Sequence, residues 1–186
     1  TLNTTDGTKT VLGQSSTVVG GDTFTSLSMD PVSGVMYATS TLCGASSSLY
    51  TINLQTGQAS LVGTISAGSC IVSSGIDNDG NMYAVELITD TLVRIDKATG
   101  TGTVVGPLGY NANYGQGMDF DERTGGCFLF AFNIDTFLPE LRTCDTATGS
   151  TALVGPIGTG LRQISGAGIT RLTWPKFRPA TSGFKP

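Results

Sequence analysis

The chain has 186 residues, which is long enough for one domain with a real core. It has a formal net charge of −4 and no histidine. The missing histidine excludes Ser-His-Asp and Cys-His catalysis and removes the commonest zinc ligand. The acidic balance argues against nucleic acid as a partner. No apolar run reaches the roughly 18 residues of a membrane-spanning helix.

Charge is unevenly distributed along the chain. Residues 1–145 carry all 14 acidic side chains and a net charge of −9, whereas residues 146–186 carry only cations and a net charge of +5. Glycine, serine and threonine are abundant, which favours many short strands joined by tight turns. The sequence therefore predicts an acidic all-β body with a basic tail.

One strand–turn–strand pattern occurs four times. It reads "TLNTTDGTKTVLG" from Thr1, "SLYTINLQTGQASLVG" from Ser48, "TLVRIDKATGTGTVVG" from Thr91 and "ELRTCDTATGSTALVG" from Glu140. The turn glycines, 50, 43 and 49 residues apart, are Gly7, Gly57, Gly100 and Gly149, and a second glycine follows each after six residues. A turn glycine supplies the positive φ that a tight hairpin needs.

A second hairpin alternates with the first. It reads "SLSMDPVSGVMYATS" from Ser26, "GIDNDGNMYAVEL" from Gly75 and "GMDFDERTGGCFLFAF" from Gly117, and Met29, Ile76 and Met118 are predicted to be equivalent. A fourth copy begins with "GAGITRLTW" from Gly166, where Ile169 takes the same position. Two hairpins per period of 43 to 50 residues are typical of the four-stranded blades of a β-propeller.

The segments "GIDNDGNMYA" and "LVRIDKATGTGTVVG" resemble bacterial extracellular β-propeller repeats of the YVTN and quinoprotein-like type. The resemblance covers nearly the whole chain and implies a propeller fold, but this fold hosts many activities. The tryptophan-docking motifs of quinoproteins are absent, so the resemblance implies no quinone, and no cofactor is expected.

We therefore predict an all-β, four-bladed β-propeller over residues 1–173. It would comprise a half-blade at 1–13, three full blades at about 24–155 and a half-blade at about 164–173. The two half-blades are complementary, because the first supplies outer strands and the last supplies inner strands. They would complete one blade either within one chain or between two subunits, as strand addition allows.

The four cysteines are predicted to form the disulfides Cys43–Cys70 and Cys127–Cys144, because each pair falls within one blade or on adjacent strands. Two disulfides indicate an oxidising compartment, and hence a secreted, extracellular protein. The alternative is four buried thiols in a cytosolic protein.

The loop "GYNANYGQG" has the residues of a recognition site, and the loop "NIDTFLP" is predicted to lie on the same face. Aromatic rings and amides suit a glycan or a protein ligand. The alternative is a connection whose tyrosines cover the core. The candidate ligand-binding residues are Tyr110, Asn111, Asn113, Tyr114, Asp135 and Phe137.

Acidic residues suggest two further kinds of site. Asp77 to Asn81, "DNDGN", resemble the start of a calcium loop, and Asp96, Asp121 and Asp145 could act in a glycosidase-like pair. Both patterns are also explained by tight turns, in which Asp and Gly are favoured. We therefore expect no metal site and no enzymatic activity.

The tail "WPKFRPATSGFKP" (174–186) is expected to be extended, because it has three prolines and no periodicity. It could fold back on the body, link to another domain or dock on a neighbouring subunit. For docking, the candidate self-association residues are Leu2, Trp174, Lys176, Phe177, Arg178 and Phe184.

The sequence thus favours a non-enzymatic extracellular structural or adhesive module that self-associates through its termini, with a filament as one outcome. The alternatives are a monomeric secreted propeller that binds a glycan or protein, and a propeller lyase or glycosidase.

Overall fold

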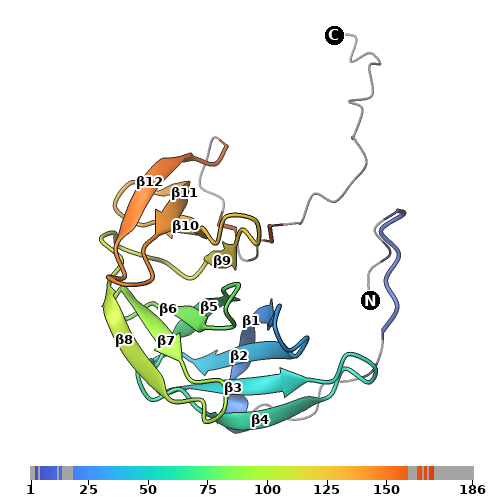
Figure 1. The fold of residues 1–186 in the computed structure, drawn as a ribbon. Coiled ribbons are helices and arrows are strands. Elements are labelled where there is room, and N and C mark those ends of the chain that lie inside the picture. Colours follow the sequence, from blue (N-terminus) through green and yellow to red (C-terminus); the bar gives the residue numbers. More distant parts are fainter. Residues whose placement is uncertain are drawn as a thin grey trace, which may run out of the picture.

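The structure, a computed structural model, describes residues 3, 5–11, 13, 19–158, 163, 164, 166, 168 and 169. After a short 3-10 turn (Val19–Gly21), these residues form twelve strands in three antiparallel four-stranded sheets (Figure 1). Blade 1 holds β1 (Thr23–Met29), β2 (Met36–Leu42), β3 (Ser46–Ile52) and β4 (Ala59–Thr64). Blade 2 holds β5 (Ile71–Ile76), β6 (Met82–Glu86), β7 (Thr91–Ile95) and β8 (Gly102–Pro107). Blade 3 holds β9 (Gly117–Phe120), β10 (Cys127–Asn133), β11 (Leu138–Cys144) and β12 (Thr151–Pro156).

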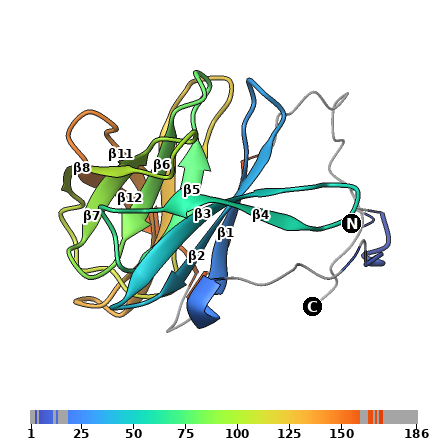
Figure 2. The ribbon, with the colours of Figure 1, turned by 90° about the horizontal axis from the view of Figure 1, so that it is seen from below.

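The three blades fan around a common axis. Each pairs its strands in sequence order, so that β1, β5 and β9 lie innermost and β4, β8 and β12 form the rim (Figures 1 and 2). Strand β5 contacts both β1 and β9. The fold of the described residues is thus an all-β arrangement of three blades, and the predicted fourth blade stays a prediction.

The outer hairpin turns share one geometry. In blade 2 the Asp96 N–H donates to the Thr101 carbonyl at 2.8 Å, and the Gly100 N–H donates to the Asp96 carbonyl at 2.8 Å. Blades 1 and 3 repeat these two bonds, and so do the residues around Gly7, where the Asn3 N–H donates to the Thr8 carbonyl at 2.8 Å. Residues near the N-terminus therefore form the same turn as the outer half of a complete blade.

The inner hairpins correct one predicted equivalence. Ile76 pairs with Met82, and the residue that pairs at the same point of blade 3 is Phe120, opposite Cys127. Met118 therefore lies two residues before the predicted position. The motif "MDFD" contains two aspartates, and the turn begins at the second, Asp121, whose N–H donates to the Gly126 carbonyl at 2.8 Å.

Apolar cores fill the spaces between successive blades. The core between blades 1 and 2 includes the buried residues Leu49, Ile65, Ile71, Met82 and Val93. The core between blades 2 and 3 includes Leu92, Leu108, Met118, Phe120 and Leu129. Full burial of one such side chain contributes about 1.5–3 kcal/mol, so these inter-blade contacts are a major stabilising contribution to the sheets.

Two disulfides lie where the sequence places them. Cys43, in the turn after β2, is bridged to Cys70, just before β5, with Cα atoms 4.3 Å apart. Cys127 and Cys144 face each other on β10 and β11, with Cα atoms 5.2 Å apart. The first bridge links blade 1 to the start of blade 2, and the second links the two middle strands of blade 3 at the start of β10 and the end of β11.

A backbone contact recurs between neighbouring blades. The second glycine of each outer hairpin presses against the turn of the following blade: Gly63 against Thr99 and Gly106 against Thr148. A Cβ at either glycine would overlap the threonine carbonyl oxygen and lie 3.1 Å from the carbonyl carbon. Gly13 makes the same contact with Thr56 of blade 1, and we call this contact the glycine joint.

One ion pair also joins the blades. The Lys97 Nζ in the outer turn of blade 2 lies 2.5 Å from the Asp30 Oδ2 in the inner turn of blade 1, and it lies 5.6 Å from the centre of the Tyr37 ring. Burial alone would raise the pKa of Asp30, but hydrogen bonds from Lys97, Ser33 and the Val32 N–H outweigh it and lower the pKa to about 2.

The Asp30 pair predicts a loss of stability in acid. Because the folded-state pKa lies below the ordinary 3.8, its contribution is present above pH 3.8 and disappears as the pH falls toward 2. Urea unfolding should show that, between pH 5 and pH 2, the free energy of unfolding falls by about 2 kcal/mol more in the unmodified protein than in Asp30→Asn. Lys97→Met should also weaken the dependence of the free energy of unfolding on pH. An Asp30→Asn profile identical to that of the unmodified protein would contradict the assignment.

The glycine joint predicts a large difference between two glycines in equivalent strand positions. Gly106→Ala should lower the free energy of unfolding by about 1–3 kcal/mol, because its methyl group would overlap the neighbouring backbone. Gly155→Ala is the matched control, because no described atom lies within 4 Å of a Cβ at Gly155. Urea unfolding of dilute protein measures both. Equal effects would show that the joint does not constrain the fold.

Candidate functional site

The two loops with predicted recognition residues lie together on one end of the blades. Ala112 forms an isolated β-bridge with Asn133, and the Ile134 N–H donates to the Asn111 carbonyl at 2.9 Å. The Asn111 Nδ2 also donates to the Asp135 Oδ1 at 3.2 Å. The loops 109–116 and 133–138 are thus held as one unit.

Tyr110 is an anchor of this unit. Its side chain is buried, its hydroxyl donates to the Gln116 Oε1 at 2.8 Å, and the Arg142 guanidinium lies 4.6 Å from the centre of its ring. Burial raises the pKa of Tyr110 well above its ordinary value, so the hydroxyl is a neutral donor. Tyr110 therefore supports the loop from within, as in the alternative in which tyrosines cover the core.

Tyr114 and Phe137 are the exposed aromatic residues of these loops, at 63% and 56% exposure. Tyr114 borders a hollow of about 550 Å³, whose other lining residues come from blade 1, its disulfide and β5: Thr23, Phe24, Thr25, Thr41, Leu42, Cys43 and Val72. Phe137 stands at the tip of the β10–β11 hairpin with a φ of 55°. Of these two residues, the structure therefore places Tyr114 at this hollow.

A buried ion pair beneath the loops was not anticipated from the sequence. The Arg142 Nη1 lies 2.5 Å from the Glu140 Oε2, and the Arg142 Nε donates to the Thr151 Oγ1 at 2.9 Å. The Glu140 Oε1 accepts hydrogen bonds from the Asn133 amide and the Thr136 hydroxyl, each at 3.2 Å. These partners make the pair a structural link between β11, β12 and the 133–138 loop.

The acidic residues proposed for catalysis or calcium lie in turns. Asp96, Asp121 and Asp145 each accept a hydrogen bond from the backbone N–H two residues later, at 2.8 to 3.0 Å. The Asp77 Oδ1 accepts from the N–H groups of Asp79 and Asn81. Within the described ranges, no three His, Cys, Asp or Glu side chains gather as a metal site requires.

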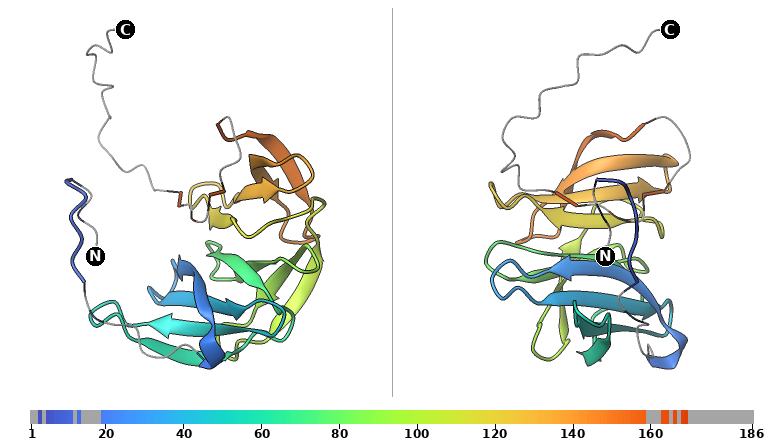
Figure 3. Two further views of the ribbon diagram at one scale, coloured as in Figure 1. Left: turned by 180° about the vertical axis from the view of Figure 1, so that it is seen from behind. Right: turned by 90° about the vertical axis from the view of Figure 1, so that its right-hand side faces the viewer.

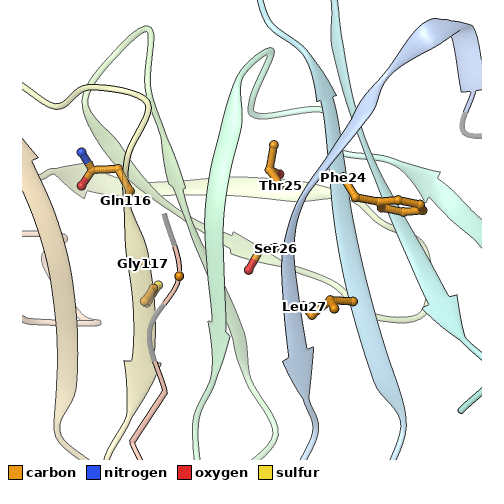
Figure 4. Close-up of a pocket in the computed structure, with 8 residues that line it drawn as sticks. Phe24, Thr25, Ser26, Leu27, Gln116 and Gly117 are labelled. Atoms are coloured by element: carbon orange, nitrogen blue, oxygen red, sulfur yellow. The ribbon is translucent and has the colours of Figure 1, made fainter. Parts of the chain in front are cut away.

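Two cavities lie beside the axis, between blade 1 and blade 3. One of about 350 Å³ is bordered by Phe24 to Leu27 on β1 and by Gln116 to Met118 and Gly166 (Figure 4). The other, of about 310 Å³, adds Gly168 and Ile169 to its lining. The Ile169 N–H donates to the Asp119 Oδ2 at 2.5 Å, so this residue is attached to β9. Residues of the predicted fourth inner strand therefore line the space between the two end blades.

In each of the two end blades, one sheet face carries incompletely buried apolar side chains. On β1, Leu27 is 64% exposed and Met29 is 44% exposed. On β10, Phe128 and Phe130 are partly buried, whereas Leu129, on the opposite face, is fully buried against blade 2. Both end blades thus carry incompletely buried apolar side chains on one face, although Ala38 and Tyr50, which are in register with Leu27, are buried.

The proposed self-association residues Leu2, Trp174, Lys176, Phe177, Arg178 and Phe184 lie outside the described residues. Their role, like the extended 174–186 tail, stays a prediction. No helix in the described part of the chain is long and apolar enough to cross a membrane.

Comparison with known proteins identifies the fold. No family model matches the chain, and no curated protein matches its sequence. Nidogen in a nidogen/laminin complex aligns with a TM-score of 0.59 at 16% identity, over 78% of this chain and 52% of nidogen. Regucalcin from Agrobacterium tumefaciens aligns with a TM-score of 0.55 at 19% identity, over 82% of this chain and 52% of that one. The Malassezia sympodialis allergen Mala s 1 aligns with a TM-score of 0.51 at 18% identity, over 76% and 54%.

The chain therefore spans about half the length of these similar structures, and its likeness to them is one of fold. Together with the three fanned sheets, the comparison shows that the chain has the blade architecture of a β-propeller.

Proposed function

We propose that this protein is a non-enzymatic, extracellular structural module that self-associates head to tail through its terminal segments and so builds filaments. The observation that carries the proposal is the space between blades 1 and 3. Sheet faces at the two ends of the arc carry incompletely buried apolar side chains on β1 and β10, and Gly166, Gly168 and Ile169 of the predicted inner strand line the space. Such faces are usually covered by a further blade.

The N-terminal residues supply matching geometry. The turn at Gly7 has the hydrogen bonds of the outer turns in complete blades, and Gly13 forms a glycine joint with blade 1. One end of each molecule thus offers outer strands, and the other end offers inner strands. A contact between unlike ends of identical molecules repeats without limit unless its rotation closes a ring.

Charge and disulfides support the remaining parts of the proposal. The −9 body and the +5 C-terminal portion would attract each other between neighbours, and salt would weaken this attraction. Two disulfides suit an oxidising, extracellular environment. The turn roles of Asp96, Asp121 and Asp145 favour a non-enzymatic module over a lyase or glycosidase.

Self-association can be tested by sedimentation velocity over a range of protein and salt concentrations. The full chain should form a ladder of larger species that shrinks as salt rises, and a chain without residues 1–13 should remain a folded single subunit. Circular dichroism melting provides the folding control. A full chain that is monomeric at every concentration, with an unchanged truncated chain, would refute the proposal.

A second candidate function is ligand binding at the hollow beside Tyr114. An exposed aromatic ring over a hollow of about 550 Å³ suits a sugar ring or a protein side chain. The similar nidogen structure is of a nidogen/laminin complex, which supports a protein as one kind of partner.

Tyr114→Ala tests this second candidate. On an array of immobilised glycans, it should lower the signal of any bound glycan about tenfold or more, because a buried aromatic contact contributes over 1 kcal/mol. Phe137→Ala removes an aromatic residue of similar exposure outside the hollow and should leave the signal unchanged. Equal signals from the Tyr114→Ala and unmodified proteins would exclude the hollow as the binding site.

A further inference from the structure

Among the described residues, one glycine in the series of joint glycines lacks the joint contact. Gly13, Gly63 and Gly106 each press against the turn of the next blade, but no described atom lies within 4 Å of a Cβ at the equivalent Gly155. The turn glycines, which belong to the other partner of each joint, show the same pattern. A Cβ at Gly100 or Gly149 would lie 2.9 Å or less from the preceding blade's glycine, whereas one at Gly7 would meet no described atom within 4 Å.

The neighbouring side chain gives an independent indication. Val62 and Val105, each just before the joint glycine of its strand, are packed against the inter-blade cores. Their equivalent Val154 is 57% exposed. At the outer edge of blade 3, Val154 and Gly155 therefore occupy the positions of joint residues, but no described blade packs against them. The turn at Gly7 has the form of a turn that receives a joint glycine, but no described glycine of a preceding blade packs against it.

We propose that Gly155 of one copy packs against the Asp6–Gly7 turn of a second copy, repeating between molecules the glycine joint that Gly63 and Gly106 make within one. This inference rests on the proposed self-association and names its contact. A second copy is the fitting occupant because, in this structure, the chain's own N-terminal turn is seated beside blade 1 by Gly13 and lies away from β12 (Figures 1 and 3).

The internal joints indicate which residues should meet across the new one. At the joint of blades 1 and 2, a Cβ on Gly102 would lie 3.1 Å from the Ile65 Cγ2. At the joint of blades 2 and 3, the Thr151 N–H donates to the Leu108 carbonyl at 3.1 Å. Counted from the joint and turn glycines, Ile65 and Leu108 correspond to Ile157, and Gly102 and Thr151 correspond to Lys9.

A mixture of two single-cysteine variants tests the contact. Lys9→Cys and Ile157→Cys proteins, mixed and mildly oxidised, should form a disulfide-linked dimer on non-reducing gels. Peptide mapping should locate the bond between positions 9 and 157. Val11→Cys mixed with Ile157→Cys is the matched control and should cross-link at least about tenfold less, because Val11 corresponds to Leu61, which is 52% exposed in blade 1.

The outcomes separate this contact from the proposed function. A mixture that self-associates in sedimentation but forms no 9–157 bond would overturn the contact and leave self-association standing. If the Lys9→Cys/Ile157→Cys double variant formed the bond only within single chains, the second copy would be excluded as the occupant. If the mixture stayed monomeric and unlinked, both proposals would fail.

Gly155→Val provides a second measurement. It should weaken self-association about tenfold or more, because its side chain would overlap the incoming turn, and it should leave the melting temperature of the dilute subunit unchanged. Unchanged self-association in this variant would also overturn the contact.

Discussion

The structure depends on a close backbone contact between neighbouring blades. Because glycine has no Cβ, a strand glycine lets the carbonyl of the next blade's turn approach to a distance that a side chain would block. The turn has the same hydrogen bonds in each case, so the contact has the same shape at Gly13, Gly63 and Gly106. Successive blades therefore pack at a fixed offset, and the apolar cores between them fill a space of defined width.

Other features of the molecule reinforce this spacing. The Lys97–Asp30 ion pair and the hydrogen bond from the Asn78 amide to the Glu122 carbonyl each join the turns of adjacent blades. The Cys43–Cys70 bridge fixes the start of blade 2 beside the turn that follows β2 in blade 1. Phe24 and Thr25 border both the hollow beside Tyr114 and the cavity between blades 1 and 3, so the candidate binding surface and the candidate assembly surface meet at β1.

Much of the fold could be predicted from local patterns. Alternating hairpins, their periods and both cysteine pairs follow from turn chemistry and strand pairing, which act over short sequence distances. Met118 was misplaced because "MDFD" offers two candidate turn aspartates. The burial of Tyr110 and the Lys97–Asp30 pair, 67 residues apart, depend on tertiary packing that no local pattern contains. The second glycine of each hairpin was visible in the sequence, but its contact with the next blade requires the three-dimensional arrangement.

The most direct test of the account is electron cryo-microscopy of the assembled, native protein. Self-association through the glycine joint predicts end-to-end subunits in which Gly155 of each copy lies against the Asp6–Gly7 turn of the next, with a fourth blade shared between them. Isolated closed particles, with Gly155 against the turn of the same chain, would contradict it.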